Sequence, residues 1–178
     1  LTPPMIHRDV KTQNVLLMAT QATDMATVTK VADFGTVRED VRARENSALP
    51  SGTHNRKTHG STKNIIGTMP YMPTEYFMMG HVSEKTDAFS LGILLIELFT
   101  NTSPKDARGV IEHAETDLIS TAMKQHPGTF ELGIPSQVLD EIAAVVDRLT
   151  ETKHKKRSSL AAELPELERI CKALREAS

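Results

Sequence analysis

The segment HRDVKTQN, residues 7–14, places His, Arg, Asp, Lys and Asn within eight positions, directly before the apolar run Val15–Met18. A carboxylate such as Asp9 accepts a proton from a hydroxyl group. The ammonium of Lys11 neutralises phosphate charge, and the amide oxygen of Asn14 is a hard ligand suited to magnesium. If the backbone turns tightly, these groups suit phosphoryl transfer, in which positioning and electrostatics supply most of the catalysis. The alternative is a charged surface turn before a strand.

Composition limits the class of protein. The 178 residues suit one domain or a large piece of one, and 39% hydrophobic with 25% charged residues allow a globular core. A net charge of −2 argues against nucleic-acid binding, which needs a basic face. The longest apolar run, Leu91–Leu98, includes Glu97 and is too short to span a bilayer. A single cysteine, Cys171, excludes an internal disulfide and fits a reducing compartment such as the cytoplasm.

The first half of the chain predicts a small amount of strand. Val15–Met18 reads as a short buried strand, and residues 28–32 read as a second strand that forms a hairpin with it across a polar connector. Residues 38–62 are polar and charged with little periodicity, which predicts a long loop.

The second half predicts helices. Ser83–Asp87 is typical of a helix start, and the sequence that follows is apolar on almost every side, so we expect a buried helix over about 84–100. Further helices are expected within 107–124, 136–150 and 159–177, with a break or a new start at Pro165. The fold class predicted is therefore mainly α, with a short β-hairpin near the N-terminus.

Four further motifs follow the first in a fixed order: VADFG at 31–35, GTMPYMPTE at 67–75, DAFSLG at 87–92 and HKKRSSL at 154–160. Each is weak alone, but the ordered set resembles the C-terminal lobe of a eukaryotic-type protein kinase. The resemblance covers residues 1–178 as one lobe. It implies a catalytic loop at 7–14, Asp-Phe-Gly at 33–35, an activation segment at 33–75, and C-terminal helices at about 107–177.

The resemblance implies ATP and Mg²⁺ as cofactors and assigns catalytic roles. Asp9 would be the base that orients the acceptor hydroxyl, and Lys11 would stabilise the transferred phosphate. Asn14 and Asp33 would hold magnesium between the phosphates of ATP. Leu16 would pack under the adenine ring, although a plain core leucine fits the same position.

The resemblance also implies structural roles for His7, Phe34, Gly35, Glu75, Asp87 and Arg157. His7 and Phe34 match the lower half of the hydrophobic column that active kinases stack. Asp87 matches the buried helix residue that accepts hydrogen bonds from the catalytic loop, and Glu75 is expected to pair with Arg157. The alternatives are a core role for Phe34 and an ordinary N-terminal helix aspartate for Asp87.

The pattern Asp-x-Lys-x-x-Asn resembles serine/threonine kinases, in which the residue matching Thr68 contacts the catalytic Asp and Lys. The motif wording most resembles the tyrosine-kinase-like group, whose members mostly phosphorylate Ser and Thr. The implied partner is a protein with a Ser or Thr acceptor. Four positions depart from the family pattern and affect packing more than chemistry: Pro73 and Thr74, which replace the usual Ala-Pro, together with Phe89 and Ser158.

The resemblance further suggests a phosphorylation switch. Arg8 directly precedes the catalytic Asp, as in kinases that need loop phosphorylation, and Arg38 matches a second basic position. Thr62 is the favoured acceptor, with Ser61 and Thr58 as alternates. The competing interpretation is that these hydroxyls are only solvated loop residues.

A Gly-rich phosphate loop and a strand lysine, which belong to a kinase N-lobe, do not occur in this sequence. We expect an N-lobe upstream of Leu1, and we expect the isolated chain to be inactive without it. The location expected is the cytoplasm, or the cytoplasmic part of a larger protein. Two alternatives stay open: a non-catalytic kinase-like scaffold module, and a metal-dependent hydrolase using Asp9, Asn14 and Asp33.

Overall fold

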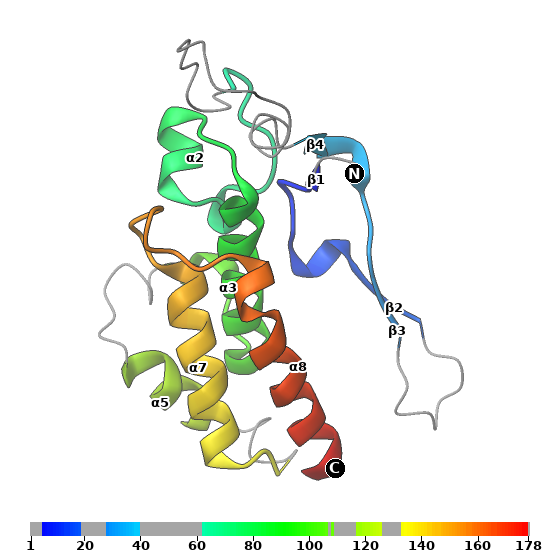
Figure 1. Ribbon diagram of the computed structural model, residues 1–178, viewed down its shortest axis with the longest axis vertical. Coiled ribbons are helices and arrows are strands. Elements are labelled where there is room, and N and C mark those ends of the chain that lie inside the picture. The colour runs from blue at the N-terminus through cyan, green and yellow to red at the C-terminus, as the bar shows by residue number, and fades with distance from the viewer. Residues whose placement is uncertain are drawn as a thin grey trace, which may run out of the picture.

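The computed structural model describes residues 5–18, 28–39, 62–106, 108, 117–125 and 133–177. Helices dominate this part of the chain, and short strands lie near the N-terminus (Figure 1). The predicted fold class is therefore confirmed. The helices described are α2 (Thr74–Met79), α3 (Glu84–Thr100), α5 (Asp117–Gln125), α7 (Ser136–Thr150) and α8 (Leu160–Ala177), with 3₁₀ turns η1 (Thr12–Asn14), η2 (Phe34–Thr36) and η3 (Met69–Tyr71).

Helix α3 is the central element, and its ends follow from its sequence. The Ser83 side chain accepts from the backbone N–H of Lys85, and the Thr86 hydroxyl accepts from the backbone N–H of Ser83. This reciprocal cap satisfies donors that a helix start leaves unpaired. The helix ends at Asn101, whose left-handed conformation (φ 50°) suits an asparagine.

The core lies where α3 packs against α5, α7 and α8 (Figure 1). Ile93, Val145, Val146 and Leu149 are fully buried there. Because apolar side chains on both α3 and α7 leave water together, their packing stabilises the larger hydrophobic core of the described residues.

A glycine sets the distance between α3 and α7. A Cβ placed on Gly92 would lie 2.4 Å from Thr150 Cγ2 and 3.3 Å from Leu149 Cβ. The Thr150 rotamer is held because its hydroxyl donates to the Val146 carbonyl at 2.8 Å. The contact therefore has little room for a larger side chain at position 92.

Strands β2 (Val15–Met18) and β3 (Val28–Val31) form the expected antiparallel hairpin, with Val15 opposite Val31 and Met18 opposite Val28. The prediction that β2 is buried is wrong, because Leu16, Leu17 and Met18 are about half or more exposed. The hairpin extends away from the helices, and in β2 only Val15 packs against the core (Figure 1).

The break expected at Pro165 is also wrong, since α8 continues through this residue. Pro165 lacks the N–H of one helical hydrogen bond. The same helix buries Ile170 against the core, and Leu160, Leu167 and Leu174 pack against it. Continuous apolar contact on both sides of the proline offsets the lost bond.

Two pieces of structure were not predicted. Helix α2 follows the Pro73 turn, and β1 (Met5–Ile6) pairs antiparallel with β4 (Arg38–Glu39). Residues 40–61 of the predicted loop, and most of 107–116 of a predicted helix, lie outside the described residues.

We predict that Gly92→Ala destabilises the protein, although alanine normally favours a helix by about 0.5–1 kcal/mol. The added methyl overlaps Thr150 Cγ2, and overpacking a core costs typically about 1–3 kcal/mol. The melting temperature should fall in Gly92→Ala and recover in Gly92→Ala/Thr150→Ser, which removes Cγ2 but keeps the hydroxyl. A higher melting temperature in Gly92→Ala alone would contradict this account.

Candidate active site

Residues 7–14, the expected catalytic loop, are held by one carboxylate of the central helix. Asp87 accepts the backbone N–H of His7 at 2.7 Å and that of Arg8 at 2.8 Å. Arg8 adopts φ 69°, a left-handed conformation that costs a residue with a Cβ about 1–2 kcal/mol. Burial raises the pKa of Asp87, and the two backbone donors act in the opposite direction. The helix thus fixes a strained backbone immediately before Asp9.

Asp9, Lys11 and Thr68 meet in one hydrogen-bonded group. Lys11 Nζ donates to Asp9 Oδ2 at 2.8 Å and to Thr68 Oγ1 at 2.9 Å, and Thr68 Oγ1 donates to Asp9 Oδ1 at 2.8 Å. Burial alone would raise the pKa of Asp9, but hydrogen bonds from Lys11, Thr68 and Asn14 and the Lys11 charge outweigh it and lower the pKa. Asp9 is therefore kept ionised and able to accept a proton.

Gly67 lets Thr68 reach this group. A Cβ on Gly67 would lie only 2.4 Å from the Arg8 carbonyl oxygen, and its φ of 123° disfavours other residues. The segment carrying Thr68 consequently lies directly against the catalytic loop, 59 residues away from Asp9 in sequence.

Asn14 and Asp33 provide the oxygen atoms expected of a magnesium site. The buried Asn14 amide nitrogen donates to the Asp9 carbonyl at 2.9 Å and to Asp9 Oδ2 at 3.2 Å, which leaves its amide oxygen as an acceptor. The Ala32 N–H donates to the Asn14 carbonyl at 2.8 Å, which brings the neighbouring Asp33 to this end of the loop. Mg²⁺ binds through one or two protein oxygens together with phosphates and water, so these residues fit the ion.

The Asp-Phe-Gly segment packs on the catalytic loop. Asp33 is exposed and left-handed (φ 64°), and an ideal Cβ on Gly35 would lie 3.4 Å from its Oδ1. The rings of His7 and Phe34 meet edge-to-face with centroids 5.3 Å apart. His7 is buried, whereas 66% of Phe34 is exposed, so the structure brings the pair together without burying the phenylalanine.

Glu75 and Arg157 form a buried bidentate ion pair. Arg157 donates to the two Glu75 carboxylate oxygens at 2.5 and 3.2 Å, and only 1% of Arg157 is exposed. Its guanidinium also donates to the carbonyls of Glu151 and Lys85 and lies 4.9 Å from the Phe89 ring centre. Helix α2 is thereby fixed to the loop between α7 and α8.

The three residues expected to form a phosphate switch have separate contacts. Arg8 Nε donates to the Thr36 carbonyl at 2.5 Å, and the Thr62 hydroxyl donates to the Asn64 carbonyl at 3.2 Å. Arg38 is half-buried in β4. Ser61 and Thr58 lie outside the described residues.

Leu16, expected beneath the adenine, is 52% exposed on β2.

Sequence reasoning missed a hydrogen-bonded group beside the catalytic loop. Tyr71 donates to Glu97 Oε2 at 2.5 Å, and the Thr12 hydroxyl lies within 3.4 Å of both side chains. Burial and the Glu97 hydrogen bond raise the pKa of Tyr71 to about 12. Twenty-six residues separate Tyr71 from Glu97, and no local spacing signals such a contact.

Comparison with known proteins decides the family. The family model for the protein kinase domain matches residues 3–168. The chain belongs to the protein kinase family. This chain is 35% identical over 139 residues to the proline-rich receptor-like protein kinase PERK2 of Arabidopsis thaliana, covering 78% of this chain and 16% of that relative. It is 32% identical over 177 residues to the wall-associated receptor kinase-like 18 of the same plant, covering 94% of this chain and 20% of the relative.

A probable LRR receptor-like serine/threonine-protein kinase of Arabidopsis thaliana is 41% identical to this chain over 105 residues. That match covers 59% of this chain and 10% of the relative. The chain thus spans a fifth or less of each of these three proteins. Within the part that the structure describes, no helix combines the length and apolar character needed to cross a membrane.

We predict that Lys11→Met raises the pKa of Asp9, because it removes both a hydrogen bond and a positive charge that favour the carboxylate. The carboxyl carbon of Asp9, followed by NMR against pH, measures this directly. The pKa of Asp9 is lowered in the folded protein, so the stability that ionised Asp9 contributes is lost as the pH falls through this folded-state pKa. Because Lys11→Met raises the pKa, the variant should lose this stability at a higher pH than the native protein. Lys63→Met, at an exposed position, is the control; equal titration in both variants would refute the assignment.

We predict that Arg157→Ala is destabilised by about 3–5 kcal/mol, because it leaves the buried Glu75 carboxylate unpaired. Lys155→Ala, two residues away and exposed, should change stability by less than about 0.5 kcal/mol. Urea unfolding of both variants measures the difference. Similar, small losses would mean that the ion pair does not hold α2.

Proposed function

We propose that this chain is the C-lobe of a protein serine/threonine kinase that transfers the γ-phosphate of ATP to Ser or Thr hydroxyls of proteins. The observation that carries the proposal is the Asp9–Lys11–Thr68 group, in which a carboxylate with a lowered pKa is hydrogen-bonded by an ammonium and a hydroxyl. The serine/threonine name of one relative adds support. An N-lobe supplied by a longer protein, and a cytoplasmic location, belong to the same proposal.

Each residue has a defined task in this proposal. Asp9 orients the acceptor hydroxyl and accepts its proton as the oxygen attacks the γ-phosphorus. Lys11 stabilises negative charge on the transferred phosphoryl group, and Thr68 keeps the Asp9 carboxylate in position. Mg²⁺, which Asn14 and Asp33 would hold, neutralises phosphate charge when bound.

Hydrogen bonds from Asn14 would help to keep Asp9 in position in such a site. Asn14 bonds both the Asp9 carbonyl and the Asp9 carboxylate, so a rotation of one side chain breaks contacts of the other. Positioning of this kind supplies much of the rate enhancement in phosphoryl transfer.

The experiment is phosphoryl transfer from Mg-ATP to Ser-, Thr- and Tyr-containing peptides by the full-length protein. We predict that Asp9→Asn lowers kcat by at least about 10²-fold, the usual contribution of a positioned base, while Asp106→Asn, an exposed control, leaves it unchanged. Transfer to Tyr alone would refute serine/threonine specificity. A protein with no transfer that still binds partners would instead favour a scaffold role.

We further propose that a phosphate on Thr62 is bound by Arg8 and Arg38 and activates the enzyme. Arg8 donates a hydrogen bond to the carbonyl of Thr36, which lies two residues before Arg38 at the start of β4. A phosphate bound by Arg8 would add a charge-assisted hydrogen bond next to this contact. Thr62 itself is held by its N–H, which donates to the Gly80 carbonyl at 2.9 Å.

The switch predicts that phosphatase treatment lowers the activity of the native full-length protein severalfold and has no effect on Thr62→Ala or Arg8→Ala. Both variants should match the treated native protein, whereas Thr152→Ala, on the surface loop after α7, should respond to phosphatase as the native protein does. Native activity that survives phosphatase unchanged would exclude the switch.

A further inference from the structure

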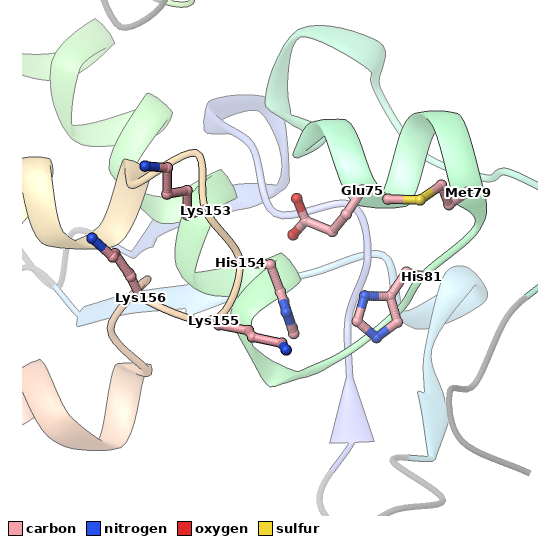
Figure 2. A pocket seen from close by; sticks show the side chains of 7 residues that line it. All are labelled: Glu75, Met79, His81, Lys153, His154, Lys155 and Lys156. Atoms are coloured by element: carbon pink, nitrogen blue, oxygen red, sulfur yellow. The ribbon is translucent and has the colours of Figure 1, made fainter.

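A cavity of about 600 Å³ lies between α2 and the α7–α8 loop, residues 151–159, and no residue of the 7–14 loop lines it (Figure 2). It is lined by Glu75, Met79, His81, Lys153, His154, Lys155 and Lys156. None of these residues takes part in the proposed phosphoryl transfer, and Glu75 has the structural role of pairing with Arg157. The volume is within the range of about 300–1,000 Å³ typical of small-molecule sites.

The wall formed by the α7–α8 loop is fixed by hydrogen bonds from α3. Lys85 Nζ donates to the carbonyls of His154 and Lys155, each at 3.3 Å. Ser83 Oγ lies 3.3 Å from His154 Nε2. The loop is also closed on itself, because Arg157 Nε donates to the Glu151 carbonyl at 2.8 Å. A ligand would therefore meet a wall that is already ordered, which lowers the entropic cost of binding.

The residues that line the cavity include more basic than acidic side chains. Glu75 is the only acidic residue that lines it, and Arg157 already neutralises that carboxylate. Among the ion pairs of the described residues, none involves Lys153, Lys155 or Lys156. Figure 2 shows Lys155 extending toward His154 and His81, whereas Lys153 and Lys156 extend the opposite way. Lys155 is thus the cation best placed to meet a ligand, and the other two add to the positive field.

Apolar surface makes up most of the cavity wall. The rings of His81 and His154 meet edge-to-face, with centroids 4.5 Å apart and planes at 67°. The Met79 thioether and the lysine stems extend this surface. An inorganic anion would not cover the apolar wall. A ligand that matches this cavity therefore has a flat apolar group to contact the wall and a negatively charged group to pair with a lysine.

We propose that this cavity binds a small aryl phosphate, with the ring against His81, His154 and Met79 and the phosphate at Lys155. A phosphate monoester carries nearly two negative charges at neutral pH, so Lys155 attracts it more strongly than a carboxylate. The ligand would contact both α2, which follows the Thr68 segment, and the α7–α8 loop. It would thereby reinforce the connection that Glu75 and Arg157 make. The proposal concerns binding alone and does not depend on the proposed kinase activity.

The test is calorimetric titration of the full-length protein with phenyl phosphate, with the nucleotide site saturated by a non-hydrolysable ATP analogue. Saturable binding is expected, weakened about tenfold or more in Lys155→Glu, because a charge-assisted bond is replaced by repulsion. Lys105→Glu makes the same charge change beyond the far end of α3 and should leave binding unchanged. If Lys155→Glu lowers the melting temperature, Lys155→Gln replaces it and should still weaken binding.

Benzoate and inorganic phosphate test the two halves of the ligand separately, and both should bind more weakly than phenyl phosphate. Free O-phosphotyrosine, which carries its phosphate on an aromatic ring, should bind at least as tightly as phenyl phosphate. Adenosine 5′-monophosphate, whose phosphate is on the ribose, should bind more weakly, and tighter binding of this nucleotide would overturn the assignment to an aryl phosphate. Absence of saturable phenyl phosphate binding, equal loss in Lys155→Glu and Lys105→Glu, or inorganic phosphate binding as tightly as phenyl phosphate would each overturn the proposal.

Discussion

The two hydrogen bonds from the His7 and Arg8 backbone to Asp87 are the contacts on which the catalytic loop depends. They join a loop near the N-terminus to a helix about 80 residues later in the chain. Arg8 takes a left-handed conformation there, which persists only where surrounding contacts determine it. Burial opposes ionisation of Asp87 and raises its pKa. The hydrogen bonds that Asp87 accepts from the loop backbone offset part of the cost of burying this carboxylate.

Other segments join the loop at this fixed point. The Thr36 hydroxyl donates to the His7 carbonyl at 2.7 Å, while Arg8 donates to the Thr36 carbonyl, so the segment after Asp-Phe-Gly is tied to the loop in both directions. Gly67 approaches the Arg8 carbonyl from the other side and delivers Thr68 to Asp9. The chemical groups lie on loops, whereas their positions are set by a buried helix, which is the usual division between function and scaffold.

Sequence reasoning predicted the structure correctly where a single local interaction determines it. Ser83 and Thr86 predict the start of α3 because a cap is a local interaction, and the apolar surface of that helix predicts its burial. The meeting of Asp9, Lys11 and Thr68 was expected only by resemblance, because no physical rule on spacing brings together residues 59 apart. Tyr71 and Glu97 could not be paired from sequence for the same reason. The exposed face of β2 and the continuous α8 were missed because tertiary packing, rather than propensity, decides burial and helix continuity.

The most direct test of this account is amide hydrogen exchange of the full-length protein and its Asp87→Asn variant, read at His7, Arg8 and Ile93. The amide of asparagine replaces one accepting oxygen by a donor, so one of the two backbone donors loses its partner. Exchange at His7 or Arg8 should accelerate by about tenfold or more, while Ile93, in the middle of α3, keeps its protection. Unchanged exchange at both His7 and Arg8 would contradict the claim that Asp87 holds the catalytic loop.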